Sequence, residues 1–361
     1  MSKKTPKKKS GLLGRIVRRF FLLLFTIVIL LVAGLALIMN LVFNGPSPAA
    51  RDVLTMSLLE PSATKWIPGL FMDEAIVDQI RNAGDDEQIQ EEQNLDDIVI
   101  MDANTLAASD EWAAYPDGIR IESYSGKTFN AHIMLIQDPS RVYLGLSSYD
   151  GFSTSKPGKR LNVAIEDEGA SAAVNAGAFN DDGTANATVG SIPSGMTIHD
   201  GKVVSNTKNA EFPGGFAGFN YDNKLVVAET MTAEQAMEQN IRDGCEFGPV
   251  LIVNGVPNQA VYSGNSGYNP RTVVGQRADG VVIFVCADGR QAGSLGATYK
   301  DMIDILISYG AVNACNMDGG SSSVMLYRDY TTGEVSMINS YSVLQSEPRR
   351  MPNFWMVKPL Q

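Results

Sequence analysis

The chain has 361 residues and a formal net charge of −11 at pH 7. The first nineteen residues carry eight Lys or Arg and no acid, and removing these eight positive charges leaves −19 for the remainder. An acidic body of this kind lacks the positive field that attracts a phosphate backbone, so nucleic acid is excluded as a partner.

The N-terminal residues have the composition of a membrane anchor. Residues 20–43 contain no charged side chain and follow a basic leader, residues 1–19. An apolar helix of about 20 residues crosses the roughly 30 Å hydrocarbon layer, and flanking Lys and Arg stay in the cytoplasm. We therefore expect a signal-anchor that crosses the cell membrane once, with a cytoplasmic N-terminus and an extracellular C-terminal domain. The alternative is a cleaved signal peptide, but its apolar stretch is usually about 7–15 residues.

Residues 44–112 are expected to form a linker. Asn44-Gly45-Pro46 ends the apolar helix, and between Asp73 and Glu111 thirteen acids accompany one base, Arg81. A ligand-binding or metal-binding tail is one interpretation of this charge. The favoured interpretation is a solvated, partly helical stalk that holds the domain away from the membrane, because like charges repel and stay hydrated.

The cysteines fit neither a disulfide framework nor a zinc motif, because their number is odd and their spacing matches no zinc pattern. They are Cys245, Cys286 and Cys315. The last two lie in apolar runs, where cysteine behaves as a small buried hydrophobic residue. A single disulfide in an oxidising compartment is the alternative.

Residues 113–361 have the pattern of one α+β domain with few helices. Short apolar runs between Gly and Asp predict strands at 118–123, 132–137, 142–147, 225–228 and 250–254. Asp200-Gly201 predicts a type I′ turn in a hairpin over 196–204. Thr298 and Asp301 form a capping box before a helix that ends at Gly310, and 232–239 is a second predicted helix. Strands before and after these helices predict a mixed sheet.

Three segments place polar residues directly beside apolar strands. They are 173–180, with Asn175, Gly177 and Phe179; 269–290, with Arg271 and Asp288; and 312–324, with Asp318, Gly319, Gly320, Ser321, Ser322 and Ser323. Loops at strand ends gather polar groups over a rigid scaffold, which is where binding and catalytic residues concentrate. We therefore treat these segments as the candidate site.

The residue types in these segments suit cleavage of a sugar–phosphate bond. Asp288 and Asp318 each follow an apolar strand, and glycoside cleavage passes through an oxocarbenium-like state that carboxylates stabilise. Arg271 is a planar fork suited to phosphate, and the N–H groups of 319–322 predict an anion-binding nest. A phosphate leaving group depends more on such donors than on a strong general acid. Each feature alone is weak evidence, because Asp-Gly is the commonest of turns and a single arginine is usually a surface residue.

The motifs in these segments resemble those of the phosphodiester glycosidase family. They are Asn175-Ala-Gly-Ala-Phe179, Asn269-Pro-Arg-Thr272 with Gly275, Asp288-Gly-Arg290, Gly296-Ala-Thr298 and Asp318-Gly-Gly-Ser-Ser-Ser323, in that order. The similarity covers about residues 115 to 358. The best-known activity of the family is removal of N-acetylglucosamine from a mannose 6-phosphate diester by an animal enzyme. Bacterial relatives are often labelled exopolysaccharide-biosynthesis proteins.

The resemblance implies that Asn175, Arg271, Asp288 and Asp318 line the pocket. Asp318 would be the catalytic carboxylate, Asp288 its partner or a structural acid, and Arg271 the residue that holds the phosphate. Substrate contacts are implied for Gly177, Phe179, Gly319, Gly320, Ser321, Ser322 and Ser323. Ser321 stands where the family often has a third glycine, a departure that bears on the size of the substrate.

Catalysis by a histidine triad is not expected. His132 and His199 lie outside the three segments, and His199 is expected to be solvated beside its turn. The serines lack the Gly-x-Ser-x-Gly pattern of a nucleophile elbow. The motifs establish no cofactor, and a divalent cation that bridges Asp288 and Asp318 is the alternative, because hard oxygen ligands suit Mg²⁺ and Ca²⁺.

The expected function is that of an extracytoplasmic hydrolase, a glycosidase that cleaves the sugar–phosphate linkage of a glycosyl phosphodiester. Its substrate would be a carbohydrate or sugar phosphate in an envelope glycopolymer or a related glycan. One alternative is an enzyme that transfers the sugar during exopolysaccharide assembly, and another is a non-catalytic glycan-binding module. The presence of Asp288, Asp318 and Arg271 favours an enzyme over a binding module.

Overall fold

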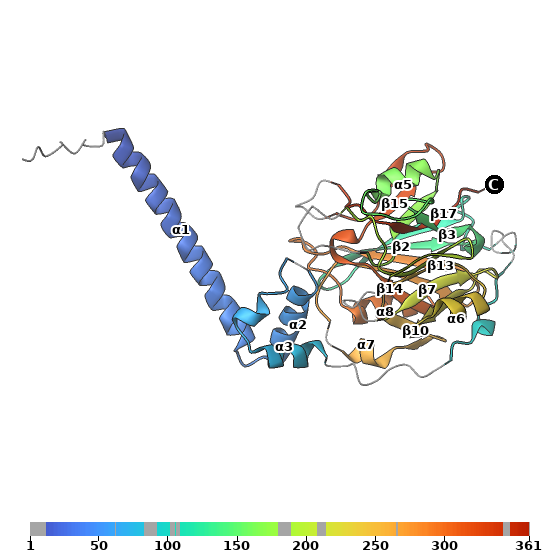
Figure 1. Cartoon of the computed structure of the whole chain (residues 1–361), viewed down its shortest axis with the longest axis horizontal. Helices are drawn as coiled ribbons and strands as arrows, with labels where there is room; N and C mark the ends of the chain where they lie inside the picture. Colours follow the sequence, from blue (N-terminus) through green and yellow to red (C-terminus); the bar gives the residue numbers. More distant parts are fainter. Residues whose placement is uncertain are drawn as a thin grey trace, which may run out of the picture.

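The computed structural model describes residues 12–61, 63–82, 92–101, 105, 109–179, 189–207, 214–264, 266–341 and 347–360. The leader up to residue 11 and Asn180, the last residue of the first polar segment, lie outside this range. One long helix, α1 (Leu12–Phe43), projects from a body made mostly of strands (Figure 1).

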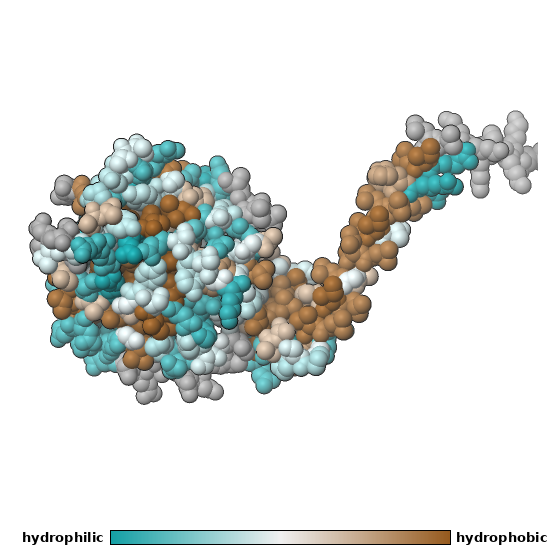
Figure 2. Space-filling model, turned by 180° about the vertical axis from the view of Figure 1, so that it is seen from behind, coloured by the Kyte–Doolittle hydropathy of each residue, from teal (hydrophilic) through white to brown (hydrophobic). Residues whose placement is uncertain are grey.

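Helix α1 contains the predicted apolar span. Residues Gly14–Phe43 are long and apolar enough to cross a membrane, and the most apolar window of this span is not buried against the body. Figure 2 shows apolar surface along most of the helix. The N-terminal apolar helix is thus confirmed, and its length and composition fit a membrane anchor or a signal sequence.

The chain folds back at the end of α1. Ser47 accepts a hydrogen bond from the amide of Ala50 and so caps α2 (Pro48–Leu59). A short 3₁₀ turn, η1 (Pro68–Leu70), and α3 (Glu74–Arg81) follow. The ring of Phe43 at the end of α1 stacks on Phe71, and the two belong to a small apolar cluster at the junction. These contacts hold α2 and α3 against the base of α1.

Part of the predicted linker lies on the body and not in solvent. The side chain of Gln93 donates to the carbonyl of Leu225 and accepts from the amide of Val227, both in β8 (Leu225–Ala228). Ile98, just after the turn η2 (Leu95–Asp97), is 1% exposed. This stretch is therefore not the solvated stalk that its charge predicts, because its few apolar and amide side chains find partners on the domain.

Strands form three sheets, which pair antiparallel throughout the described residues. The largest contains, in spatial order, β1 (Ile119–Ser125), β2 (Asn130–Ile136), β13 (Val282–Ala287), β12 (Arg271–Arg277), β14 (Ala311–Met317), β10 (Val250–Val253) and β11 (Val256–Pro257). The second contains β16 (Val335–Met337), β15 (Met325–Arg328), β4 (Ala172–Asn175), β17 (Asn353–Val357) and β3 (Val142–Leu146). The third contains β6 (Lys202–Thr207), β5 (Gly195–His199), β9 (Ile241–Glu246), β7 (Phe216–Asn220) and β8.

The main core lies where the three sheets face one another. It combines residues such as Phe284, Trp355 and Phe219, one from each sheet, all fully buried. The outer faces carry α5 (Leu161–Asp167), α6 (Ala233–Glu238), α7 (Gln259–Ser263) and α8 (Tyr299–Ser308), with the turns η3 (Pro139–Arg141) and η4 (Gly320–Ser322) between strands. Strand β13 is buried along its whole length, which explains its continuous apolar sequence, whereas the buried polar side chains of β12, such as Thr272 and Gln276, are hydrogen-bonded.

The α+β class is confirmed, with three antiparallel sheets where one mixed sheet was predicted. The hairpin of β5 and β6 turns at Asp200 and Gly201, whose φ angles of 49° and 70° are those of a type I′ turn. Helices α8 and α6 begin with capping boxes at Thr298 and Thr232. All three cysteines are free and buried, which confirms the buried thiols predicted for Cys286 and Cys315.

Candidate active site

The polar segments meet where three neighbouring strands of the seven-stranded sheet begin or end. Strand β12 begins there, between the ends of β13 and β14. Arg271, the first residue of β12, is paired with Ala287, and Asp288 follows directly. Thr272 is paired with Met317, so Asp318 lies beside the start of β12 on the other side. The backbone thus brings Arg271, Asp288 and Asp318 to the same place.

Their side chains do not form one cluster, because Arg271 and Asp288 point to opposite faces of the sheet. The guanidinium of Arg271 stacks 3.9 Å from the ring centre of Tyr299, at the start of α8. The Oδ2 atom of Asp288 lies 3.6 Å from Nε2 of His132 on β2, and its Oδ1 accepts from the amide of Ser340. His132 therefore lies next to Asp288, although it is far from the three polar segments in the sequence.

Asn175 is a fully buried connector. Its Nδ2 donates to the backbone carbonyl of Asp318 at 2.6 Å. Its Oδ1 accepts from the hydroxyl of Thr272 at 2.8 Å and from the amide of Val324 at 3.2 Å. These bonds join the end of β4 to β12 and to the turn after β14. The amide that was expected to face a ligand instead fixes the backbone that carries Asp318.

Asp318 shares its surroundings with two arginines. Burial lowers the pKa of Arg290, and the carboxylates of Glu60 and Asp318 oppose this effect while Arg271 adds to it. Arg290 donates from Nη2 to Oδ1 of Asn269 at 2.9 Å. The carboxylate of Asp318 therefore lies in the electrostatic field of the Arg290 guanidinium, which Asn269 orients and which lies against Gly320.

The Gly-Gly-Ser-Ser-Ser turn after Asp318 is close to the start of β12. Gly320 has φ +60° and its amide donates to the carbonyl of Pro270 at 2.8 Å. The amides of Ser322 and Ser323 also donate to backbone carbonyls. Of the amides 319–322 that were predicted to bind an anion, those of Gly319 and Ser321 are therefore the remaining candidates. Among the described residues, the buried hydroxyls of Ser322 and Ser323 have no hydrogen-bond partner. A buried polar atom without a partner is rare, and it points to a ligand or water at this turn.

Arg349 is a site residue that sequence reasoning missed. Its guanidinium lies 4.7 Å from the ring centre of Phe179, and Nη1 donates to Oγ of Ser321 at 3.3 Å. Tyr341, whose hydroxyl bonds the carbonyl of Ser321, lies beside it and within the field of Asp318. The sequence feature that could have pointed to this residue is the pair of adjacent arginines, Arg349 and Arg350, in an acidic domain.

Gly177 packs against protein and not toward the turn. Its amide donates to Oδ1 of Asn353 at 2.9 Å, and a Cβ atom would lie 2.9 Å from Cβ of Cys245. In the part of the chain that the structure describes, no three His, Cys, Asp or Glu side chains gather as a metal site. The two oxygens of Asp288 face protein groups, so a cation that bridges it to Asp318 has no support in this geometry.

The phosphodiester glycosidase family matches residues 168–358, which is more than half of the chain. The chain belongs to the phosphodiester glycosidase family. Its catalytic and substrate-binding candidates all lie within the matched residues, from Asn175 to Ser323, as does Arg349. Glu60 and His132, which the structure adds to the surroundings of the site, lie outside them.

The proteins to which this glycosidase family member is similar have low sequence identity to it. The SPbeta prophage-derived uncharacterized protein YomE of Bacillus subtilis is 28% identical over 203 residues, 55% of this chain, and the match spans only 29% of that relative. A solved catalytic domain of zebrafish N-acetylglucosamine-1-phosphodiester alpha-N-acetylglucosaminidase, auto-inhibited by its pro-peptide, has a TM-score of 0.51 and 19% identity. That match covers 66% of this chain and 82% of the zebrafish chain, and it shows a common fold. A putative exported protein of Burkholderia pseudomallei has a TM-score of 0.46 and 15% identity, over 71% of this chain and 89% of that chain.

Proposed function

We propose that the protein is an extracytoplasmic hydrolase that cleaves the sugar–phosphate linkage of a glycosyl phosphodiester in an envelope glycopolymer or a related glycan. Family membership supports the reaction class. The observation that carries the proposal is that Asp318 follows β14 beside the start of β12, where Arg271 is the first residue of the strand and the guanidinium of Arg290 lies against Gly320. A carboxylate next to guanidinium groups suits a substrate that becomes cationic at the sugar and anionic at the leaving phosphate.

Each group has a distinct task in this reaction. The bond between the anomeric carbon and the phosphate oxygen breaks, and the bonding electrons leave with the phosphate. The carboxylate of Asp318 stabilises the positive charge that develops on the sugar, while Arg271 and Arg290 bind the phosphate oxygens. Water then adds its hydroxyl to the anomeric carbon and releases a proton. The products are a free sugar and a phosphate monoester.

The proposed location follows from α1. Its apolar span would anchor the protein in the cell membrane as a single pass, with Arg15, Arg18 and Arg19 on the cytoplasmic side. The acidic body, which includes the site, would then face the exterior, where envelope polymers with sugar–phosphate links are found.

Product analysis tests the proposal. The full-length protein in detergent micelles is incubated with alkyl glycosyl phosphodiesters of several sugars, with and without an acceptor alcohol. Free sugar and phosphate monoester in equal amounts, absent with Asp318→Asn, support hydrolysis. A new glycoside without free sugar would favour transfer during exopolysaccharide assembly. Binding without products would favour a glycan-binding module, and either of these two results overturns the hydrolase.

A further inference from the structure

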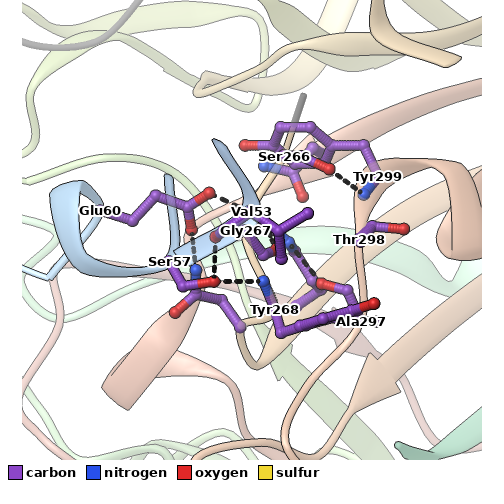
Figure 3. A network of polar contacts seen from close by, with 12 residues as sticks. Val53, Ser57, Glu60, Ser266, Gly267, Tyr268, Ala297, Thr298 and Tyr299 are labelled. Carbon is purple, nitrogen blue, oxygen red and sulfur yellow. Dashed lines mark hydrogen bonds and ion pairs between the residues drawn. The ribbon is translucent and has the colours of Figure 1, made fainter. Parts of the chain in front are cut away.

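Helix α2 packs against the loop that precedes β12, and Figure 3 shows Ser57 and Glu60 beside Gly267 and Tyr268. Ser57 on α2 accepts a hydrogen bond from the amide of Tyr268 through its Oγ atom, at 2.9 Å. Gly267 approaches the helix so closely that a Cβ atom there would lie 2.3 Å from the backbone nitrogen of Ser57. Gly267, in the loop between α7 and β12, thus has no room for a side chain, because the backbone of α2 occupies that space.

The residue that ends α2 places a carboxylate on the site. Glu60 accepts from Nη2 of Arg271 at 2.8 Å through Oε1 and from Nδ2 of Asn269 at 2.6 Å through Oε2. Figure 3 shows this carboxylate directed from α2 toward the residues around 267–268. Asn269 also accepts a hydrogen bond from Arg290, so the carboxylate of Glu60 bonds Arg271 directly and is linked to Arg290 through Asn269.

Glu60 is the carboxylate partner of a buried charge. The side chain of Arg271 is 3% exposed, and its other hydrogen bonds go to the backbone carbonyls of Gly267 and Ala297. Among the described residues, Glu60 forms the ion pair of Arg271. A buried guanidinium that loses its carboxylate is strongly destabilising unless another anion takes the place. Oxygen atoms of a phosphate fit the same donors as those of a carboxylate.

We infer that Glu60 is an internal substitute for the phosphate of the substrate, and that α2 is a strap that covers the site until an anionic ligand displaces it. The inference rests on the proposed function in so far as that ligand is a phosphodiester. Glu60 lies outside the residues that the glycosidase family matches, so the strap belongs to the N-terminal part of this chain.

The strap is attached to the apolar helix α1. Four residues, 44–47, separate α1 from α2, and the junction is packed by Phe43 against Phe71 and by a hydrogen bond from Nδ2 of Asn44 to the carbonyl of Phe71. Displacement of α2 therefore requires movement of the body relative to α1 or a break in this junction. Access to the site is in this way coupled to the segment proposed to be the membrane anchor.

Inorganic phosphate is the probe for the test, with the full-length protein in detergent micelles. Phosphate affinity is measured by equilibrium dialysis for the wild type, Glu60→Gln and Asp52→Asn. Asp52 is the matched control, because it lies on α2 and its ion pair is with its neighbour Arg51. We expect Glu60→Gln to bind phosphate about tenfold more tightly than the other two, since a charged hydrogen-bonded competitor is removed. Equal affinities for all three would overturn the inference.

Hydrogen exchange gives a second measurement that does not depend on the variant. Saturating phosphate is expected to speed amide exchange of residues 50–59 in the wild type, because α2 leaves the body. Unchanged exchange in phosphate-saturated protein would show a fixed structural contact and contradict the strap.

If phosphate releases α2 but no phosphodiester is cleaved, the proposed function fails and the strap stands. If cleavage occurs with the same KM in the wild type and Glu60→Gln, the function stands and the strap fails.

Discussion

The Nε2 atom of His132 lies 3.6 Å from Oδ2 of Asp288, across the neighbouring strands β2 and β13. The second carboxylate oxygen of Asp288 accepts from the amide of Ser340, and the side chain is 4% exposed. Asp288 is thus held between a histidine and a backbone donor. This geometry gives Asp288 a defined orientation and fits the interpretation of a structural or supporting acid more closely than that of a second catalytic carboxylate.

A double-mutant cycle tests that relationship. His132→Gln and Asp288→Asn are each expected to lower the free energy of unfolding, and the two losses should be coupled by about 0.5–3 kcal/mol because the side chains are in contact. Chemical denaturation of the four proteins measures the coupling. Losses that simply add would mean that the two residues do not interact.

Replacing Asp318 separates chemistry from folding. Asp318→Asn keeps the shape of the side chain and removes its charge, so we expect kcat for a glycosyl phosphodiester to fall by about 10²–10³ with little change in melting temperature. Asp222→Asn is the control, because Asp222 is an exposed residue in the turn between β7 and β8. Normal turnover by the Asp318 variant would remove this residue from the mechanism.

The role of Arg271 predicts substrate-selective damage. Arg271→Lys keeps the charge but loses the fork that reaches Glu60, Gly267 and Ala297. We expect kcat/KM for glycosyl phosphodiesters to fall by about tenfold or more relative to that for neutral aryl glycosides. The ratio of the two substrates corrects for any loss of folded protein. A ratio equal to that of the wild type would contradict phosphate binding by Arg271.

His199 predicts a dependence of stability on pH. Its Nδ1 lies 3.2 Å from Oδ1 of Asp243 and 2.8 Å from the carbonyl of Leu144, so the expectation of a solvated ring is wrong. The hydrogen bond to Asp243 raises the pKa of His199 above its ordinary value of 6.5, against the effect of burial. The folded state then binds the proton more tightly than the unfolded state. The stabilisation is complete below pH 6.5 and is lost as the pH rises through the raised pKa.

Melting temperatures measured from pH 5 to 9 check this sign. The wild type should exceed His199→Gln by most at the acidic end, and the difference should shrink as the pH increases. A difference that grows with pH would contradict the assignment.

The three thiols provide a test of the core. Burial raises the pKa of Cys245, Cys286 and Cys315, so the reactive thiolate is scarce as well as inaccessible. We expect a thiol reagent to modify none of them in the native protein and all three after denaturation. Prior treatment with a reductant should make no difference, and a gain of thiols on reduction would reveal a disulfide.

Local elements were predictable because their signals are local. The capping box at Thr298, the turn at Asp200-Gly201 and the apolar helix before Asn44 each depend on a few neighbouring residues. The three-sheet arrangement was not predictable in this way, since antiparallel pairing such as that of β17 with β3 joins residues about 200 positions apart. The contacts of Gln93 and Ile98 with the body were not predictable either, because the many acidic residues around them indicated a solvated segment.

The candidate site was predictable to the extent that its residues follow strands. Asp288 and Asp318 were expected at strand ends, and the register of β12 with its neighbours brings them to Arg271, the first residue of β12. The directions of the side chains were not predictable from the sequence. Arg271 is paired with Ala287, and Asp288, one residue further on, points to the opposite face of the sheet. Glu60, His132 and Arg349 come from other parts of the chain, and no motif joins them to the site.

Cleavage in water enriched in oxygen-18 is the most direct test of the central claim that the bond between sugar and oxygen breaks. The full-length protein is given a glycosyl phosphodiester, and both products are analysed by mass spectrometry at short times, with a correction for exchange at the anomeric carbon. The heavy isotope is expected in the released sugar and not in the phosphate monoester. Heavy oxygen in the phosphate would show attack at phosphorus, and the enzyme would then be a phosphodiesterase and not a glycosidase.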